Sequence, residues 1–144
     1  ILYILIADKS NKINKIIMKK FNNILIKSFH CVNLILIVLY LYPGSILGYV
    51  LYNDLSIELQ ITRNFLISSN HFYMFIFLSI IGILAYRKSN RINLLIKYLF
   101  ALSILLELLH LFIPNRSFEF NDLSGNIIGV FIVIIIYKIK NKHV

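Results

Sequence analysis

Long apolar runs are the feature that most constrains what this chain can fold into. Hydrophobic residues make up 59% of its 144 residues and charged residues only 15%. A soluble domain of this length could not bury so much apolar surface. A helix needs about 20 apolar residues to cross roughly 30 Å of hydrocarbon, and a backbone in lipid must satisfy its own hydrogen bonds. The sequence therefore predicts an all-α, polytopic membrane protein.

Four runs qualify, or nearly qualify, as transmembrane helices. They are Phe29 to Leu51, Asn70 to Tyr86, Ile92 to Ile113 and Leu123 to Tyr137. None shows the strict alternation of an outer-membrane strand. We expect Pro114 to end the third helix, and Asn121 or Asp122 to cap the fourth.

The basic residues indicate an orientation. Of the 15 basic residues, all but Lys97, Arg63 and Arg116 precede the first run, separate the second from the third, or follow the fourth. Lys97 lies in the first turns of the third run and can extend its side chain back to the same side. Because positive loops stay in the cytoplasm, we expect both termini inside, an N-in/C-in topology. The net charge of +9 then reports topology, and we expect no nucleic-acid partner.

The N-terminal region differs in amino-acid composition from the first apolar run. We expect residues 1–28, rich in Lys, Asn and Ile, to form a basic cytoplasmic tail before a membrane domain at 29–144. Met18, followed by two lysines, is a plausible true start, so we expect insertion without residues 1–17. A signal peptide from Met18 is the competing reading, but its apolar stretch is too long. The single cysteine, Cys31, allows no intrachain disulfide.

Polar groups gather around the end of the third run and the start of the fourth. Glu107 lies about 10 Å below the helix end at Pro114, and His110 shares its face. Asp122 and Asn126 share one face of the fourth helix. Ionisable residues inside a membrane are costly and mark a functional site by default.

His71, which opens the second run, and Arg116, in the connecting turn, fall in the same outer layer. The predicted ligand-binding set is therefore His71, Glu107, His110, Arg116, Asp122 and Asn126. We expect the second, third and fourth segments to pack together, with Glu107 facing Asn126 and His71, and Arg116 within reach of Asp122. The structural alternatives are a helix cap at Asp122, interhelical bonding by Asn126 and an interfacial anchor at Arg116.

Two glycine pairs, Gly44–Gly48 and Gly125–Gly129, have the spacing that lets helix backbones approach closely. We expect close approach at Gly125 to draw Asn126 and Asp122 toward the third segment.

The sequence gives less support to metal-binding, nucleotide-binding and nucleophilic sites. Glu107-x-x-His110 has the spacing of a di-iron half-site, but the second half is absent from the sequence. A zinc site from His71, Glu107 and His110 is geometrically conceivable, but we expect no metal or cofactor. The sequence contains no P-loop, dinucleotide fingerprint or nucleophile elbow.

The motifs E-x-x-H-x-F-x-P-x-R from Glu107 to Arg116 and D-x-x-x-N-x-x-G from Asp122 to Gly129 resemble the VanZ-like family of small bacterial membrane proteins. The similarity covers roughly residues 70–137, including the His71-Phe72 pair. The family more often has glutamine in place of His110 and glycine in place of Asn115. An aspartate-lysine pair commonly stands at positions 67 and 68, which here are isoleucine and serine.

That family is named for a protein linked to teicoplanin resistance, so the resemblance implies a cell-envelope role in the bacterial inner membrane. The first hypothesis is an outward-facing polar pocket that binds an envelope lipid, a lipid-linked precursor or a glycopeptide. The second is a membrane enzyme that uses Glu107 and His110 as an acid/base pair on a lipid-linked substrate. The third is a structural membrane partner whose polar residues only lock the bundle. The sequence leaves the oligomeric state open.

Overall fold

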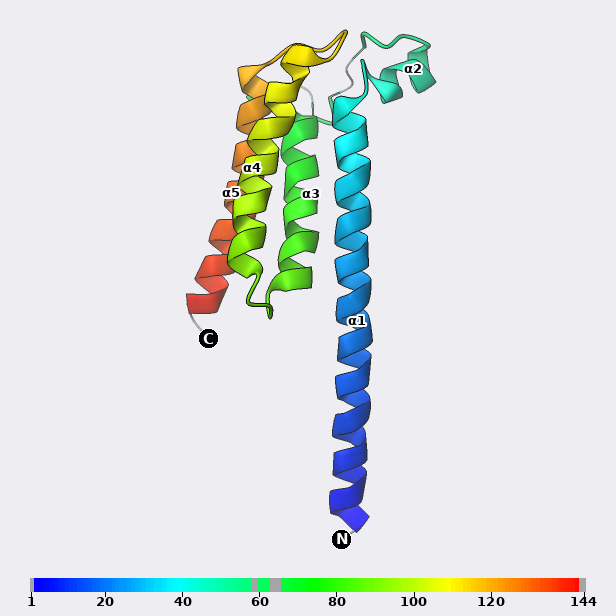
Figure 1. The fold of residues 1–144 in the computed structure, drawn as a ribbon, viewed down its shortest axis with the longest axis vertical. Helices are drawn as coiled ribbons and strands as arrows, with labels where there is room; N and C mark the ends of the chain where they lie inside the picture. The colour runs from blue at the N-terminus through cyan, green and yellow to red at the C-terminus, as the bar shows by residue number, and fades with distance from the viewer. Residues whose placement is uncertain (1, 58–59, 63–65, 143–144) are drawn as a thin grey trace.

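The computed structural model describes residues 2–57, 60–62 and 66–142, and these ranges contain helices but no strand. The elements in chain order are α1 (Leu2–Leu41), α2 (Ile46–Tyr52), α3 (Ser69–Tyr86), α4 (Ile92–Leu109), the 3₁₀ turn η1 (His110–Phe112) and α5 (Phe120–Lys142). Figure 1 shows α1, α3, α4 and α5 running alongside one another as a bundle.

Four helices are long and apolar enough to cross a membrane. The candidate spans are Asn11–Leu41, Ser69–Tyr86, Ile92–Phe112 and Phe120–Lys142. Large apolar side chains are exposed on the outside of all four, where a soluble protein would carry polar ones. The predicted all-α fold with four membrane-spanning helices is confirmed.

The first helix is longer than a membrane requires. α1 has 40 residues, so it is about 60 Å long, roughly twice the thickness of the hydrocarbon. Its N-terminal half extends beyond the other helices (Figure 1). From Leu2 onward, the predicted basic tail is continuous with the first span. The division at residue 28 stays a prediction.

The predicted end of the first span, at Leu51, is wrong because α1 ends at Leu41. Pro43 cannot continue a helix, and Gly44 takes φ +99°, a conformation that favours glycine. The short helix α2 then starts after Ser45, whose hydroxyl accepts a hydrogen bond from the Gly48 N–H at 2.9 Å.

The glycine spacing at Gly44–Gly48 predicted a close approach of two helices, but this pair does not lie between two spanning helices. A Cβ on Gly44 would stand 2.9 Å from the Cβ of Leu55, and one on Gly48 would meet the carbonyl oxygen of Ile57. These glycines instead let the connection after α1 fold back on itself.

The second glycine pair does lie at a helix–helix interface. A Cβ on Gly125 would stand 2.8 Å from the Ser68 carbonyl oxygen, and one on Gly129 would stand 2.7 Å from that of Phe72. The helix that meets both glycines is thus α3, the second span. Asn126 also reaches the third span, as predicted, because its Nδ2 donates to the Ser103 carbonyl of α4. α3 also packs against α1 and makes its most extensive contact with α5, so it is the central helix.

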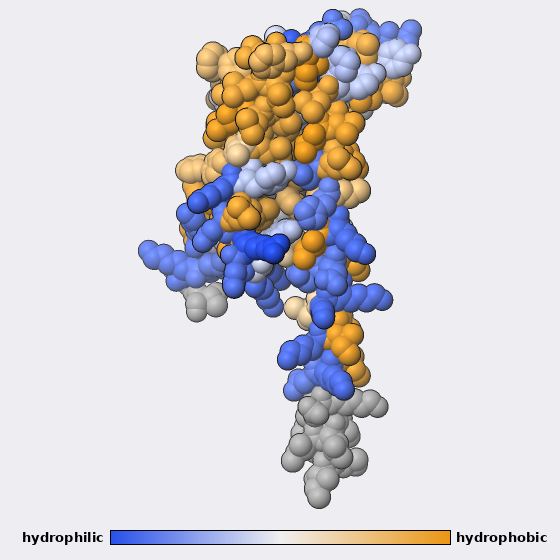
Figure 2. All heavy atoms as spheres, in the orientation of Figure 1, coloured by the Kyte–Doolittle hydropathy of each residue, from blue (hydrophilic) through white to orange (hydrophobic). Residues whose placement is uncertain are grey.

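The two ends of the bundle differ in charge. Figure 2 shows an apolar belt above a band of hydrophilic side chains that surrounds the α3–α4 turn and the C-terminal end of α5. We call this the basic end, and we call the opposite end, where α2 and η1 lie, the α2 end (Figure 1). The N-in/C-in orientation stays a prediction, and Arg63, used in its derivation, lies outside the described residues.

Candidate functional site

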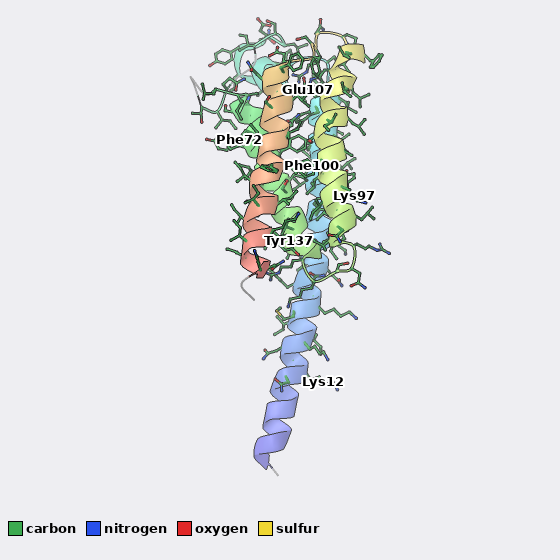
Figure 3. All side chains as sticks on the ribbon, turned by 90° about the vertical axis from the view of Figure 1, so that its left-hand side faces the viewer. Lys12, Phe72, Lys97, Phe100, Glu107 and Tyr137 are labelled. Carbon is green, nitrogen blue, oxygen red and sulfur yellow. The ribbon has the colours of Figure 1, made fainter. Side chains whose placement is uncertain are left out.

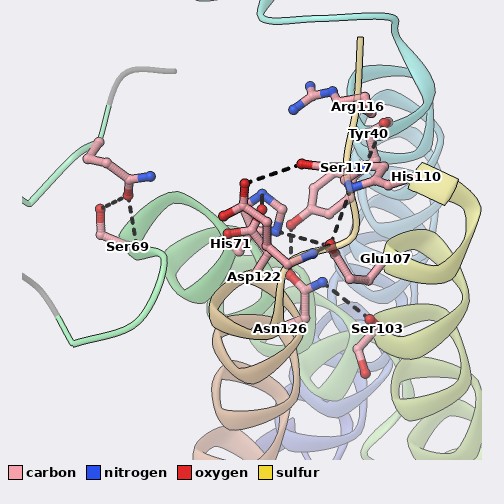
Figure 4. A network of polar contacts seen from close by, with 12 residues as sticks. Tyr40, Ser69, His71, Ser103, Glu107, His110, Arg116, Ser117, Asp122 and Asn126 are labelled. Carbon is pink, nitrogen blue, oxygen red and sulfur yellow. Dashed lines mark hydrogen bonds and ion pairs between the residues drawn. The ribbon is translucent and has the colours of Figure 1, made fainter. Parts of the chain in front are cut away.

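Buried polar side chains gather at the α2 end of the bundle. Figure 3 places Glu107 near this end, far from Lys97 and Tyr137. Figure 4 shows the cluster between α1, α3, α4 and α5. Its buried members are Tyr40, Ser103, Glu107, His110, Asp122 and Asn126, and His71 joins them with a side chain 11% exposed.

Glu107 is the centre of this cluster and is 0% exposed. Its Oε1 accepts a hydrogen bond from the Glu119 N–H at 3.0 Å and lies 3.4 Å from Nδ1 of His110. Its Oε2 lies 3.8 Å from Nδ1 of His71. A carboxylate at this depth costs a few kcal/mol unless it is paired or hydrated. The prediction that Glu107 is buried and faces His71 is confirmed, whereas its predicted approach to Asn126 stays a prediction.

His71, on α3, contacts an acidic side chain on each of the other two spans, α4 and α5. Its Nε2 lies 3.3 Å from Oδ2 of Asp122, while its Nδ1 faces Glu107. The close approach of α3 at Gly125 explains this reach, because a Cβ there would stand 3.3 Å from the Cβ of His71. The predicted packing of the second, third and fourth spans is confirmed.

Asn126 lies one turn deeper and is bonded to two other helices. Its Oδ1 accepts a hydrogen bond from the Tyr40 hydroxyl at 2.9 Å, and its Nδ2 donates to the Ser103 carbonyl at 3.2 Å. The Tyr40 carbonyl also lies 3.1 Å from Nε2 of His110. The Tyr40 ring centroid lies 4.8 Å from that of His71 and 6.0 Å from that of His110.

Tyr40 is thus a member of the site that the sequence reasoning missed. The available signal was its place near the end of the first run, just before Pro43, at the depth of the other polar groups. One tyrosine among nine does not stand out by residue type.

The turn after η1 positions Arg116. Asn115 adopts φ +60°, in the left-handed region, and the Arg116 N–H donates to the Ile113 carbonyl at 3.2 Å. Asparagine tolerates this conformation better than most residues, although glycine adopts it most readily. This explains how Asn115 can replace the glycine of the VanZ-like pattern.

The Arg116 side chain reaches back to the connection after α1. Its Nε donates to the Tyr42 carbonyl at 3.3 Å, and its Nη2 donates to the Gly44 carbonyl at 2.8 Å. The predicted reach of Arg116 to Asp122 stays a prediction.

The start of α5 differs from the prediction. The helix begins at Phe120, and the Glu119 carbonyl accepts hydrogen bonds from the N–H groups of Asp122 and Leu123. Asn121 and Asp122 are therefore first-turn residues, and the expected cap at either is wrong. The carboxylate of Asp122 is favourably placed at the positive end of the helix dipole.

A cavity of about 360 Å³ lies beside the cluster, with walls from α1, the start of α2, residues 60–61 and α3. Its apolar lining residues are Leu39, Ile46, Ile61 and Met74, and its polar ones are Tyr40, Ser45, Gln60, Asn70, His71, His110 and Arg116. A smaller hollow of about 160 Å³ is lined in part by Asp122 and Glu119. The cluster therefore borders two hollows, and His71 and Asp122 face different ones.

The comparison with protein families agrees with the motifs. The chain matches VanZ/LLP1 over residues 3–141, a range that includes the whole polar cluster and all of the described helices except the first residue of α1 and the last of α5. No curated protein and no solved structure gives a significant match. The chain is therefore a multi-pass membrane protein that belongs to the VanZ/LLP1 family.

Proposed function

We propose that the cavity at the α2 end binds the phosphate-bearing headgroup of an envelope lipid or lipid-linked precursor, from the outer face of the bacterial cytoplasmic membrane. The observation that carries this proposal is the two-sided lining of the cavity. Leu39 and Met74 offer an apolar wall, whereas Arg116, Asn70 and Gln60 offer polar groups. A lipid is divided in the same way, with a polar headgroup joined to apolar chains.

Arg116 is the proposed contact for the phosphate. A guanidinium group can donate two parallel hydrogen bonds to phosphate oxygens, a geometry that lysine cannot supply. Its bonds to the Tyr42 and Gly44 carbonyls hold the guanidinium in position at the cavity wall.

The size of the cavity limits what enters it. A volume of about 360 Å³ is at the lower end of ordinary ligand sites. The headgroup would fit, while the remaining chains would stay in the bilayer beside Leu39, which is 39% exposed. A lipid-tailed glycopeptide of the teicoplanin type would compete for the same surface, and this competition would link the protein to antibiotic resistance.

A second candidate function is acid/base catalysis on the same kind of substrate. It is favoured by the 3.4 Å contact between Glu107 and His110 and by the presence of His110 in the cavity wall. His110→Gln separates the two functions, because glutamine can donate a hydrogen bond but cannot transfer a proton at neutral pH. A binding protein would keep its ligand in this variant, whereas an enzyme would lose turnover.

The lipid proposal is tested by native mass spectrometry of the purified protein in mild detergent. We expect a retained phosphate-bearing lipid in the wild type. Met74→Trp should reduce its occupancy, because the larger side chain fills the cavity. Phe77→Trp is the matched control, because Phe77 lies on the same helix but is 51% exposed and does not line the cavity. Absence of any such lipid, or equal occupancy in Met74→Trp, would refute the proposal.

A further inference from the structure

The polar cluster contains two buried atoms that lack a hydrogen bond. Nδ1 of His71 and Oε2 of Glu107 have no hydrogen-bond partner among residues 2–57, 60–62 and 66–142. They face each other at 3.8 Å, which is too long for a hydrogen bond. Leaving a buried polar atom unpaired costs about 1–3 kcal/mol, so two such atoms facing each other require an explanation.

The rest of the Glu107 carboxylate is held firmly by the protein. Both hydrogen-bonding contacts, from the Glu119 N–H and from His110, go to Oε1. Oε2 is thereby aimed at His71. Metal-binding carboxylates and histidines are commonly oriented by such outer contacts on the atom that does not bind the ion.

We propose that His71, Glu107 and Asp122 form a binding site for one divalent transition-metal ion, with Zn²⁺ or Mn²⁺ as its occupant. One ligand atom from each of these residues lies within 4.8 Å of the other two. Tetrahedral zinc ligands stand about 3.3 Å apart, given metal–ligand bonds of about 2.0–2.1 Å. The ion would bind Nδ1 of His71, and the 3.8 Å between this atom and Oε2 of Glu107 needs a contraction of about 0.5 Å to match this separation. The Asp122 oxygen, within 4.8 Å of the other ligand atoms, must also move closer.

The ligand set selects the class of ion. An imidazole with two carboxylates suits Zn²⁺ or Mn²⁺, whereas Ca²⁺ and Mg²⁺ prefer oxygen ligands alone. Two carboxylates in a low-dielectric site also favour a divalent positive charge. The hollow beside Asp122 provides an entry path for the ion.

This site differs from the one considered from sequence. His110 is no longer a ligand, because its Nδ1 faces Oε1 of Glu107 and its Nε2 lies 3.1 Å from the Tyr40 carbonyl. Asp122 takes its place. Metal binding does not depend on the proposed lipid function, so each can fail without the other.

The test uses the full chain, free of any affinity tag, in detergent without added lipid and stripped of metal by a chelator. Titration calorimetry with Zn²⁺ and separately with Mn²⁺ should find one ion per chain for at least one of the two. Glu107→Gln and Asp122→Asn should each weaken binding by more than about 100-fold, beyond the loss usual for outer contacts. His110→Gln should weaken it by about 10-fold. The control His30→Gln, at an exposed histidine, should bind as the wild type does.

A measurement on the wild type keeps the test valid if a variant fails to fold. X-ray absorption at the zinc edge should show one imidazole and the rest oxygen ligands. No saturable binding of either ion would overturn the proposal. So would binding that survives both carboxylate substitutions, or a zinc shell with no imidazole or with more than one.

Discussion

The two ends of the bundle differ in how they accommodate polar side chains between the helices. Toward the basic end, two neutral contacts join helices through tyrosine hydroxyls. Nδ2 of Asn33 donates to the Tyr98 hydroxyl at 2.6 Å, and an exposed His30 lies 3.1 Å from the Tyr86 hydroxyl. The charged groups there stay exposed on the surface of the bundle, as Lys97 does.

At the α2 end, ionisable side chains are buried together. Glu107, His110 and Asp122 are all buried, and Glu107 keeps an unpaired oxygen atom. The basic end shows that this chain can pack helices with neutral polar pairs and aromatic rings. Among the residues whose burial the structure describes, buried ionisable side chains lie at the α2 end alone, and they are better explained by a function there than by a need of the fold.

The largest expected effect concerns which compartment each end faces. We predict that Ser117→Cys, at the α2 end, reacts with an impermeant maleimide in intact cells, whereas Lys88→Cys, at the basic end, reacts only after lysis. The reason is the excess of basic residues on one side. Cys31 is exposed and must first be replaced by serine. The reverse labelling pattern would invert the topology and put the proposed pocket in the cytoplasm.

The next effect concerns helix packing at the two ends. Gly125→Ala should lower the free energy of unfolding by about 1–3 kcal/mol, because its Cβ would meet a backbone carbonyl of α3 at 2.8 Å. Gly82→Ala, toward the basic end, should change it by less than about 1 kcal/mol, since the Cβ would meet side-chain atoms alone among its nearest neighbours, of the Phe29 ring at 3.0 Å and of Leu95 at 3.3 Å. Denaturant unfolding in detergent measures both free energies. Equal losses of stability in the two variants would contradict the predicted difference between the two ends.

The level of the site along the bundle could be predicted from the sequence, because the rise of a helix is fixed per residue. Counting back from Pro114 placed Glu107 and His110, and counting forward along α5 placed Asn126, all at the level where they are found. The break after Leu41 was missed because hydropathy stays high from Tyr42 to Leu51, although Pro43 and Gly44 marked it.

Other features depended on which helices meet. The spacing of Gly125 and Gly129 predicts a close approach but cannot say that α3 is the partner. Tyr40 joins the site only because α1 packs against α3, a contact with no local signal in the sequence.

A smaller effect concerns single hydroxyl groups. Tyr40→Phe should lower the free energy of unfolding by about 1 kcal/mol, because the buried Asn126 Oδ1 loses a donor. Tyr86→Phe should change it by no more than about 0.5 kcal/mol, because its partner His30 is exposed and can bond to water. Thermal unfolding of the two variants in parallel checks this, and a larger loss for Tyr86→Phe would contradict the contrast between the ends.

The central claim is that the α2 end serves ligand binding while the basic end serves packing. The most direct test measures lipid affinity and unfolding free energy on the same samples of Arg116→Gln and Tyr98→Phe. We predict that Arg116→Gln weakens binding of a phosphate-bearing lipid by about 10-fold or more, because a charge-assisted hydrogen bond is lost. Tyr98→Phe should leave that affinity unchanged and cost about 1 kcal/mol of stability. Unchanged lipid affinity in Arg116→Gln, or an equal loss of affinity in Tyr98→Phe, would contradict the account.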